Sequence, residues 1–99
     1  MKNWIERLND FYTATDAEPI SPKAASLYGY LLYRFNRVYW AQPLKIRLYA
    51  LADATKQSLF SIKAARRELV ERGFIRYESG GGSASAAYYL TDDEEENNT

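Results

Sequence analysis

The side chains in this sequence whose types and spacing best suit contact with a ligand are Ser58, Ser61, Lys63, Ala64 and Arg67. Hydroxyl, ammonium and guanidinium groups donate hydrogen bonds, and phosphate oxygens and base edges accept them. An alanine among such donors would let a nucleic acid approach the backbone closely. The pattern therefore predicts a nucleic-acid-binding surface, and the alternative is that these residues only solvate an exposed helix face.

Other kinds of chemistry have few candidate residues. The chain contains no His and no Cys, so imidazole bases, thiolate nucleophiles and the usual zinc ligands are absent from it. The periodicity of the predicted helices already explains the carboxylates Asp53, Glu68 and Glu71 as solvent-facing or ion-paired residues. We expect a protein that is not an enzyme and that has no metal or cofactor.

The net charge of zero hides a strong segregation of charge. Five consecutive acids, Asp92 to Glu96, account for much of the acidic total. Between Arg34 and Arg76 the chain carries ten Lys or Arg against three acidic residues, a net charge of +7. Such a segment favours an anionic partner, although scattered surface charge is the alternative.

A helix from about residue 58 to 72 must position the candidate donors. Ser58 has the character of an N-cap, and Ile62, Ala65 and Leu69, with Arg66 and Val70 in part, form its inward side. Gly73 is the expected C-cap. Two strands follow, Phe74 to Glu78 and Ala86 to Leu90, around a glycine-rich tip of residues 79–85 with no positive charge.

Three further helices are predicted upstream. The first runs from Asn3 to about Ala14, with an apolar stripe for packing formed by Trp4, Ile5, Leu8, Phe11 and Tyr12. The second begins at the cap Ser21, with Pro22 at its first position, and continues to about Val38. A short one spans Leu48 to Thr55, after a strand or extended lead at residues 44–47.

The order helix, turn, helix and hairpin is typical of a winged helix-turn-helix. We expect a mainly α fold with a small β-hairpin and an extra amino-terminal helix, as one domain over residues 1–91. Residues 92–99 are predicted to be a disordered acidic tail or linker. No apolar run is long enough to span a bilayer and the amino terminus does not resemble a signal peptide, so a cytoplasmic protein without membrane contact is expected.

Further basic and aromatic residues extend the predicted surfaces. Six more cations are candidate contacts to DNA phosphates: Arg34, Arg37, Lys45, Arg47, Lys56 and Arg76. Surplus aromatic residues suggest an oligomer interface formed by Trp4, Phe11, Tyr12, Tyr39 and Trp40, and stacking on single-stranded nucleic acid is the alternative for the aromatic surplus. Leu59 and Phe60, at the start of the helix, could contact thymine methyls, pack under the wing or contact a protein, and the sequence favours the last two.

Three runs of residues resemble a known family: WIERLNDFY, ISPKAASLYGYLLYRFNRVYW and SLFSIKAARRELVERGFIRYESGGGSASAAYYLT. Together they resemble the amino-terminal winged-helix domain of DnaD-like replication proteins, the primosome and phage replisome-organiser family. The resemblance covers about Trp4 to Leu90. It implies self-association, contact with other replisome proteins and a role in DNA replication. It also implies a separate carboxy-terminal domain, missing from this sequence, on which DNA binding and DNA remodelling often depend in that family.

The leading hypothesis is therefore a DNA-binding and oligomerisation module of a replication initiation protein. Its helix at about 58–72 would enter the major groove of duplex DNA, and the wing at 74–90 would lie along the backbone. The alternatives are a protein-interaction or self-assembly module without useful DNA affinity, and a transcriptional regulator.

Overall fold

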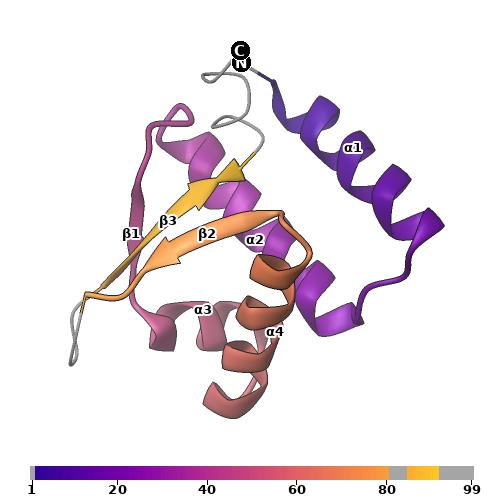
Figure 1. Cartoon of the computed structure of the whole chain (residues 1–99). Helices are drawn as coiled ribbons and strands as arrows, with labels where there is room; N and C mark the ends of the chain where they lie inside the picture. Colours follow the sequence, from indigo (N-terminus) through magenta and orange to yellow (C-terminus); the bar gives the residue numbers. More distant parts are fainter. Residues whose placement is uncertain (1, 81–84, 92–99) are drawn as a thin grey trace.

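Helices and a small antiparallel sheet alternate along the computed structural model, which describes residues 2–80 and 85–91 (Figure 1). The described elements are α1 (Trp4–Ala17), α2 (Pro22–Arg37), β1 (Leu44–Ile46), α3 (Leu48–Thr55), α4 (Leu59–Glu71), β2 (Ile75–Glu78) and β3 (Ala86–Leu90). The prediction of a mainly helical chain with a β-hairpin is confirmed. Most of the predicted glycine-rich tip and the whole acidic tail lie outside the described residues.

Local hydrogen bonds and backbone dihedral angles explain where the helices begin and end. The Ser21 hydroxyl accepts a hydrogen bond from the Ala24 amide, and the Ser58 hydroxyl accepts one from the Ser61 amide, so both predicted N-caps are confirmed. After α4, Gly73 has a φ of 78°, in the left-handed region that glycine occupies without steric cost. Lys56 ends α3 with a φ of 57°.

The three strands are arranged in the order β1-β3-β2, with both pairs antiparallel. The segment expected to be a short strand or an extended lead is therefore a strand, in which Lys45 pairs with Ala87 of β3. Because side chains alternate between the faces of a sheet, Ile46, Tyr88 and Ile75 are buried on the inner face. Lys45 and Arg76 lie on the outer face.

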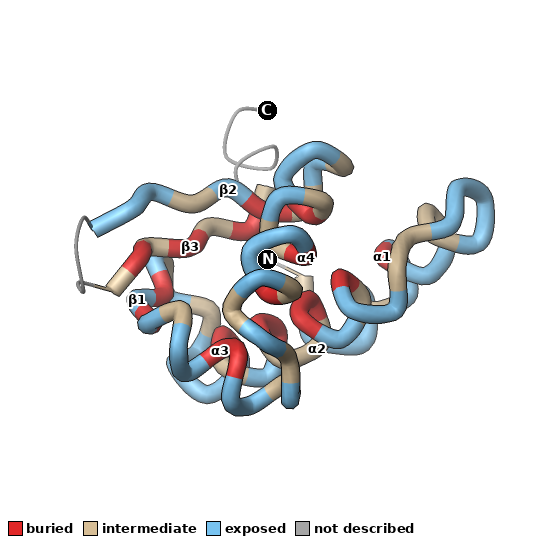
Figure 2. The backbone as a smooth tube through the Cα atoms, turned by 90° about the horizontal axis from the view of Figure 1, so that it is seen from below, coloured by how far each residue is buried: buried red, intermediate tan, exposed pale blue. Residues whose placement is uncertain are grey.

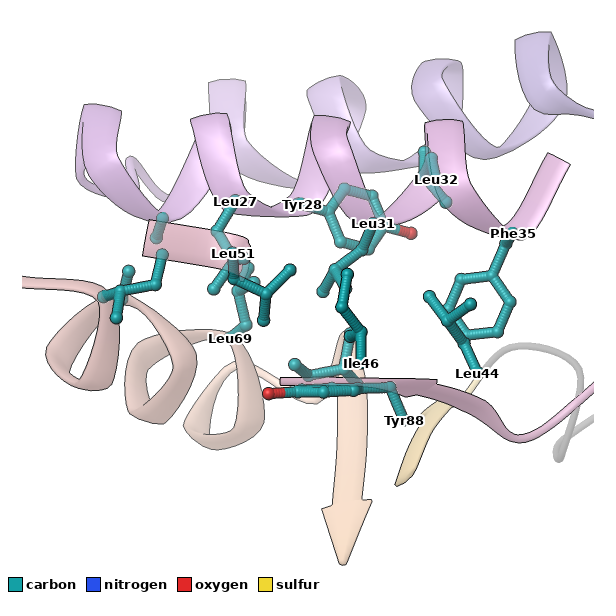
Figure 3. Close-up of a cluster of buried hydrophobic side chains, with 14 of the residues drawn as sticks. Leu27, Tyr28, Leu31, Leu32, Phe35, Leu44, Ile46, Leu51, Leu69 and Tyr88 are labelled. Carbon is teal, nitrogen blue, oxygen red and sulfur yellow. The ribbon is translucent and has the colours of Figure 1, made fainter. Parts of the chain in front are cut away.

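The core lies between α2 and the sheet, and α3 and α4 close it at the end where α2 begins. Figure 3 shows Leu31 and Phe35 projecting from α2 toward Leu44, Ile46 and Tyr88 of the sheet. Leu51 of α3 and Leu69 of α4 complete this cluster, and both are fully buried. Since α4 contributes to the core along one side only, its other side remains available at the surface.

Helix α1 ends three residues later than predicted and is rotated relative to the prediction. The predicted packing stripe is wrong in part, because Ile5 is 70% exposed and Tyr12 53% exposed, whereas Arg7 is fully buried. The Arg7 guanidinium lies 4.5 Å from the centroid of the Trp40 ring, and its Nε donates to the Lys2 carbonyl oxygen. Phe11 stacks on Tyr28 at 4.3 Å between ring centroids. These two anchors set which side of α1 faces the core.

The loop after α2 provides the anchor for Arg7. Tyr39 and Trp40 both have positive φ values, 54° and 64°, a conformation that is costly for large side chains. The Trp40 amide donates to the Phe35 carbonyl oxygen at 2.8 Å, and the Trp40 ring lies nearly parallel to that of Phe35. Tyr39, in contrast, projects into solvent.

Replacing Phe11 by alanine should lower the free energy of unfolding by about 3–5 kcal/mol, because it opens a cavity between α1 and α2. Replacing the adjacent Tyr12 should change it by less than about 1 kcal/mol, since that ring is largely in water. Urea denaturation of both variants measures the difference. Equal losses of stability would contradict an orientation of α1 in which Phe11 faces the core and Tyr12 faces solvent.

Candidate nucleic-acid interface

Helix α4 presents one exposed stripe along its whole length, formed by residues three or four positions apart. The members of this stripe are Phe60, Lys63, Ala64, Arg67 and Glu71, and Val70, which was predicted to face partly inward, is 38% exposed beside them. The opposite side of the helix, with Ile62, Ala65 and Leu69, is buried. The three predicted contact residues Lys63, Ala64 and Arg67 therefore lie together on the surface, and the stripe is basic in the second and third turns of the helix and acidic at its last residue.

One flank of α4 is fixed to the start of α2 by Glu68. Its two carboxylate oxygens accept hydrogen bonds from the Ser21 hydroxyl at 2.6 Å and from the Ser21 amide at 3.1 Å. Because Ser21 also caps α2, one residue joins the beginning of α2 to the middle of α4. This contact removes the Glu68 carboxylate from the exposed stripe, where it would repel an anionic ligand.

The other flank of α4 is fixed to the sheet by Arg66, which is half-buried as the sequence indicated. Its guanidinium carbon lies 4.0 Å from the centroid of the Tyr77 ring on β2, and the guanidinium donates to the Tyr88 hydroxyl on β3 at 3.1 Å. Burial raises the pKa of Tyr88 above its ordinary value of 10.0, although Arg66 opposes the shift. The phenol is therefore neutral at physiological pH and able to accept the hydrogen bond.

The beginning of α4 holds a small cluster of polar groups. The Ser61 hydroxyl oxygen accepts hydrogen bonds from the Lys23 ammonium at 3.0 Å and from the Ser58 hydroxyl at 3.1 Å. Ser61 is thus on the flank next to α2 and not on the exposed stripe, and its own proton remains able to donate. Lys23 was not predicted to be part of this surface, because it lies outside the basic segment 34–76 and the fold alone brings it next to α4.

The other residues that were predicted to contact phosphates lie in separate parts of the molecular surface. Lys56, in the turn between α3 and α4, is exposed beside the start of α4, and Lys45 and Arg47 are exposed around β1 and the start of α3. Arg76, on the outer face of the sheet, is ion-paired with Glu78 at 2.7 Å and lies over the Tyr89 ring at 3.9 Å. Its charge is therefore partly compensated.

Arg34 and Arg37 are near the other end of α2. Arg34 is eleven residues beyond Lys23 in the same helix, which places it roughly 17 Å farther along the helix axis. The Arg34 guanidinium donates to the Tyr30 hydroxyl, and the Arg37 guanidinium donates to the Tyr33 hydroxyl. The hydrogen bond to Tyr33 raises the pKa of Arg37 above its already high ordinary value. These two residues form a separate basic and aromatic surface.

The residues predicted for an oligomer interface have different environments. Tyr12 and Tyr39 are exposed and Trp4 is partly exposed, so all three are available to a partner. Phe11 is not, because it is only 2% exposed within the core, and its assignment to a surface interface is corrected. Trp40 is half-buried against Phe35 and Arg7. In Figure 2, α1 lies at one side of the molecule with most of its length exposed.

Comparisons with protein-family models, with curated proteins and with solved structures found no match to this chain. Among residues 2–80 and 85–91, no group of three or more acidic side chains is arranged to hold a metal ion. None of the helices in these two ranges combines the length and hydropathy needed to cross a membrane.

Replacing Arg66 by alanine should lower the free energy of unfolding by about 1–3 kcal/mol, because the buried Tyr88 hydroxyl loses its donor and Tyr77 loses its cation contact. Replacing the adjacent Arg67, which is exposed, should change it by less than about 0.5 kcal/mol. Thermal unfolding of both variants tests this difference. A similar loss in the two variants would show that Arg66 does not hold the sheet to α4.

Proposed function

We propose that this chain is a winged helix-turn-helix module that binds duplex DNA and self-associates as part of a DNA replication initiation protein. The carrying observation is the exposed stripe of α4, in which Lys63, Ala64 and Arg67 are uncovered while both flanks of the helix are fixed. The order α2, β1, α3, α4, β2 and β3 is compatible with that fold. The assignment to replication rests on the resemblance to DnaD-like proteins.

The mechanism follows from the dimensions of α4 and of the major groove. A single α-helix fits the groove, which is about 12 Å wide, and helix-turn-helix proteins contact base edges mainly through the amino-terminal residues of the second helix. In α4 the second turn carries Lys63 and the third carries Arg67, whereas Glu71 lies at the far end and would be kept away from phosphates. The small Ala64 side chain permits close approach between them.

Cations around the start of α4 would contact the DNA backbone. Lys23 and Lys56 flank this end of the helix, and the positive end of the helix dipole adds to their field. The outer face of the sheet carries Lys45 on β1 and Arg76 on β2, the first strand of the wing. In this docking mode the stripe on α4 contacts bases, and these cations position the protein along the phosphates.

The double variant Lys63→Ala/Arg67→Ala should bind random-sequence duplex DNA more weakly. The logarithmic slope of its salt dependence should fall by roughly 0.9 for each phosphate group that the variant no longer neutralises. Fluorescence anisotropy at several salt concentrations measures both quantities. The control is Lys2→Ala/Thr13→Glu, which lowers the net charge by the same amount at and just before α1. Equal affinity of wild type and of the α4 variant would refute the assignment of this stripe.

Self-association is supported by a separate observation on α1. Ile5 and Tyr12 are largely exposed on α1, with Leu8 half-buried and Trp4 partly exposed beside them. Aromatic and aliphatic residues clustered in this way are typical of protein interfaces. We infer that α1 provides the contact between copies, leaving α4 available for DNA. If DNA binding fails its test, this surface supports the alternative of a protein-interaction module.

Introducing a charge into this surface with Ile5→Glu should shift the protein toward the monomer, because a carboxylate in an apolar interface loses its hydration. Sedimentation velocity over a concentration series measures the shift. Thr13→Glu, which adds the same charge to an exposed polar position of α1, should leave self-association unchanged. A wild-type protein that is strictly monomeric at high concentration would exclude this interface.

A further inference from the structure

Phe60 is an aromatic residue in the first turn of α4 that the fold does not use. Its side chain is 84% exposed, whereas the preceding Leu59 packs half-buried against the core. Phe60 therefore does not pack under the described part of the wing, residues 74–80 and 85–90. An aromatic ring carries about 150–250 Å² of mostly apolar surface, so its exposure leaves a large apolar group in water.

The position of Phe60 places it among the hydrogen-bond donors of α4. It belongs to the same exposed stripe as Lys63, Ala64 and Arg67, which follow it by three, four and seven residues respectively. Side chains with this spacing are neighbours on a helix surface. The ring and the two cations thus form one continuous surface, which suits a polyanion that also presents an apolar group.

Duplex DNA presents such a group at one place in the major groove. Each base pair offers hydrogen-bond donors and acceptors there, and thymine adds its C5-methyl group, which phenylalanine can contact. Phe60 can form no hydrogen bonds with base edges, so a methyl group is the complementary partner for it. A predominantly apolar protein partner fits less well, because it would have to bury Lys63 and Arg67 unpaired.

We propose that Phe60 reads thymine, by covering the C5-methyl group in the major groove while Lys63 and Arg67 hold the flanking phosphates or bases. This inference rests on the proposed function, since it requires α4 to enter the groove. The absence of a bulky side chain at Ala64 leaves room for the ring to reach the base. The chain would then prefer thymine-containing duplexes over otherwise identical ones that lack the methyl group.

Replacing thymine by deoxyuridine in a duplex removes only this methyl group and so provides a direct probe. We expect wild-type protein to bind the uracil duplex more weakly, by about fourfold for each methyl group covered. Phe60→Ala should bind both duplexes equally, at the lower affinity. Val38→Ala, which truncates an exposed apolar residue just after α2, should keep the preference for thymine. Because Phe60 is exposed, its replacement should leave the thermal stability unchanged.

The possible outcomes separate the inference from the function on which it depends. Salt-dependent duplex binding with equal affinities for thymine and uracil would overturn the inference and leave the proposed function standing. No duplex binding by the wild type even at low salt would overturn both. A Phe60→Ala variant that keeps the thymine preference but loses self-association in sedimentation velocity would assign the ring to a protein contact and overturn the inference.

Discussion

The rotation of α4 about its own axis is the constraint on which the candidate site depends. Apolar packing of Ile62, Ala65 and Leu69 is non-directional and would tolerate some rotation of the helix. Arg66 and Glu68 remove that freedom, because they project from opposite flanks and bind different partners. Arg66 contacts Tyr77 and Tyr88 of the sheet, and Glu68 accepts hydrogen bonds from Ser21, the N-cap of α2. With both flanks fixed, only one stripe of the helix can face outward.

A second constraint acts on α1 and has the opposite consequence for its surface. The helix is attached through Phe11, which stacks in an aromatic cluster with Tyr28 and Phe74, and through Arg7, which lies over Trp40. Burying a guanidinium turns the helix so that Ile5 and Tyr12 face solvent. The same contacts that attach α1 therefore create its exposed apolar surface. A packing arrangement that buried the apolar stripe would have left Arg7 outside.

Local signals in the sequence were enough to predict the elements, and long-range contacts limited the prediction of their surroundings. The N-caps Ser21 and Ser58 and the left-handed conformation of Gly73 depend on neighbours within a few residues and are confirmed, although the C-cap of α4 is Arg72 and Gly73 follows it. The rotation of α1 depends on Trp40, more than thirty residues away from Arg7, so periodicity alone misassigned its inner face. Ser61 was placed outward by periodicity, but Lys23 holds it on a flank.

The distribution of charge explains how a chain of zero net charge could present a basic surface to DNA. Electrostatic interactions in physiological salt decay over about 8 Å, so a ligand responds to nearby charges and not to the total. Helix α1 carries Glu6, Asp10 and Asp16, whereas residues 21–52 contain no acidic residue. In α4, the Glu68 carboxylate is hydrogen-bonded to Ser21, and Glu71 lies in the last turn. The field around the first half of α4 is therefore set by Lys23, Lys56 and Lys63, as the proposed contact with phosphates requires.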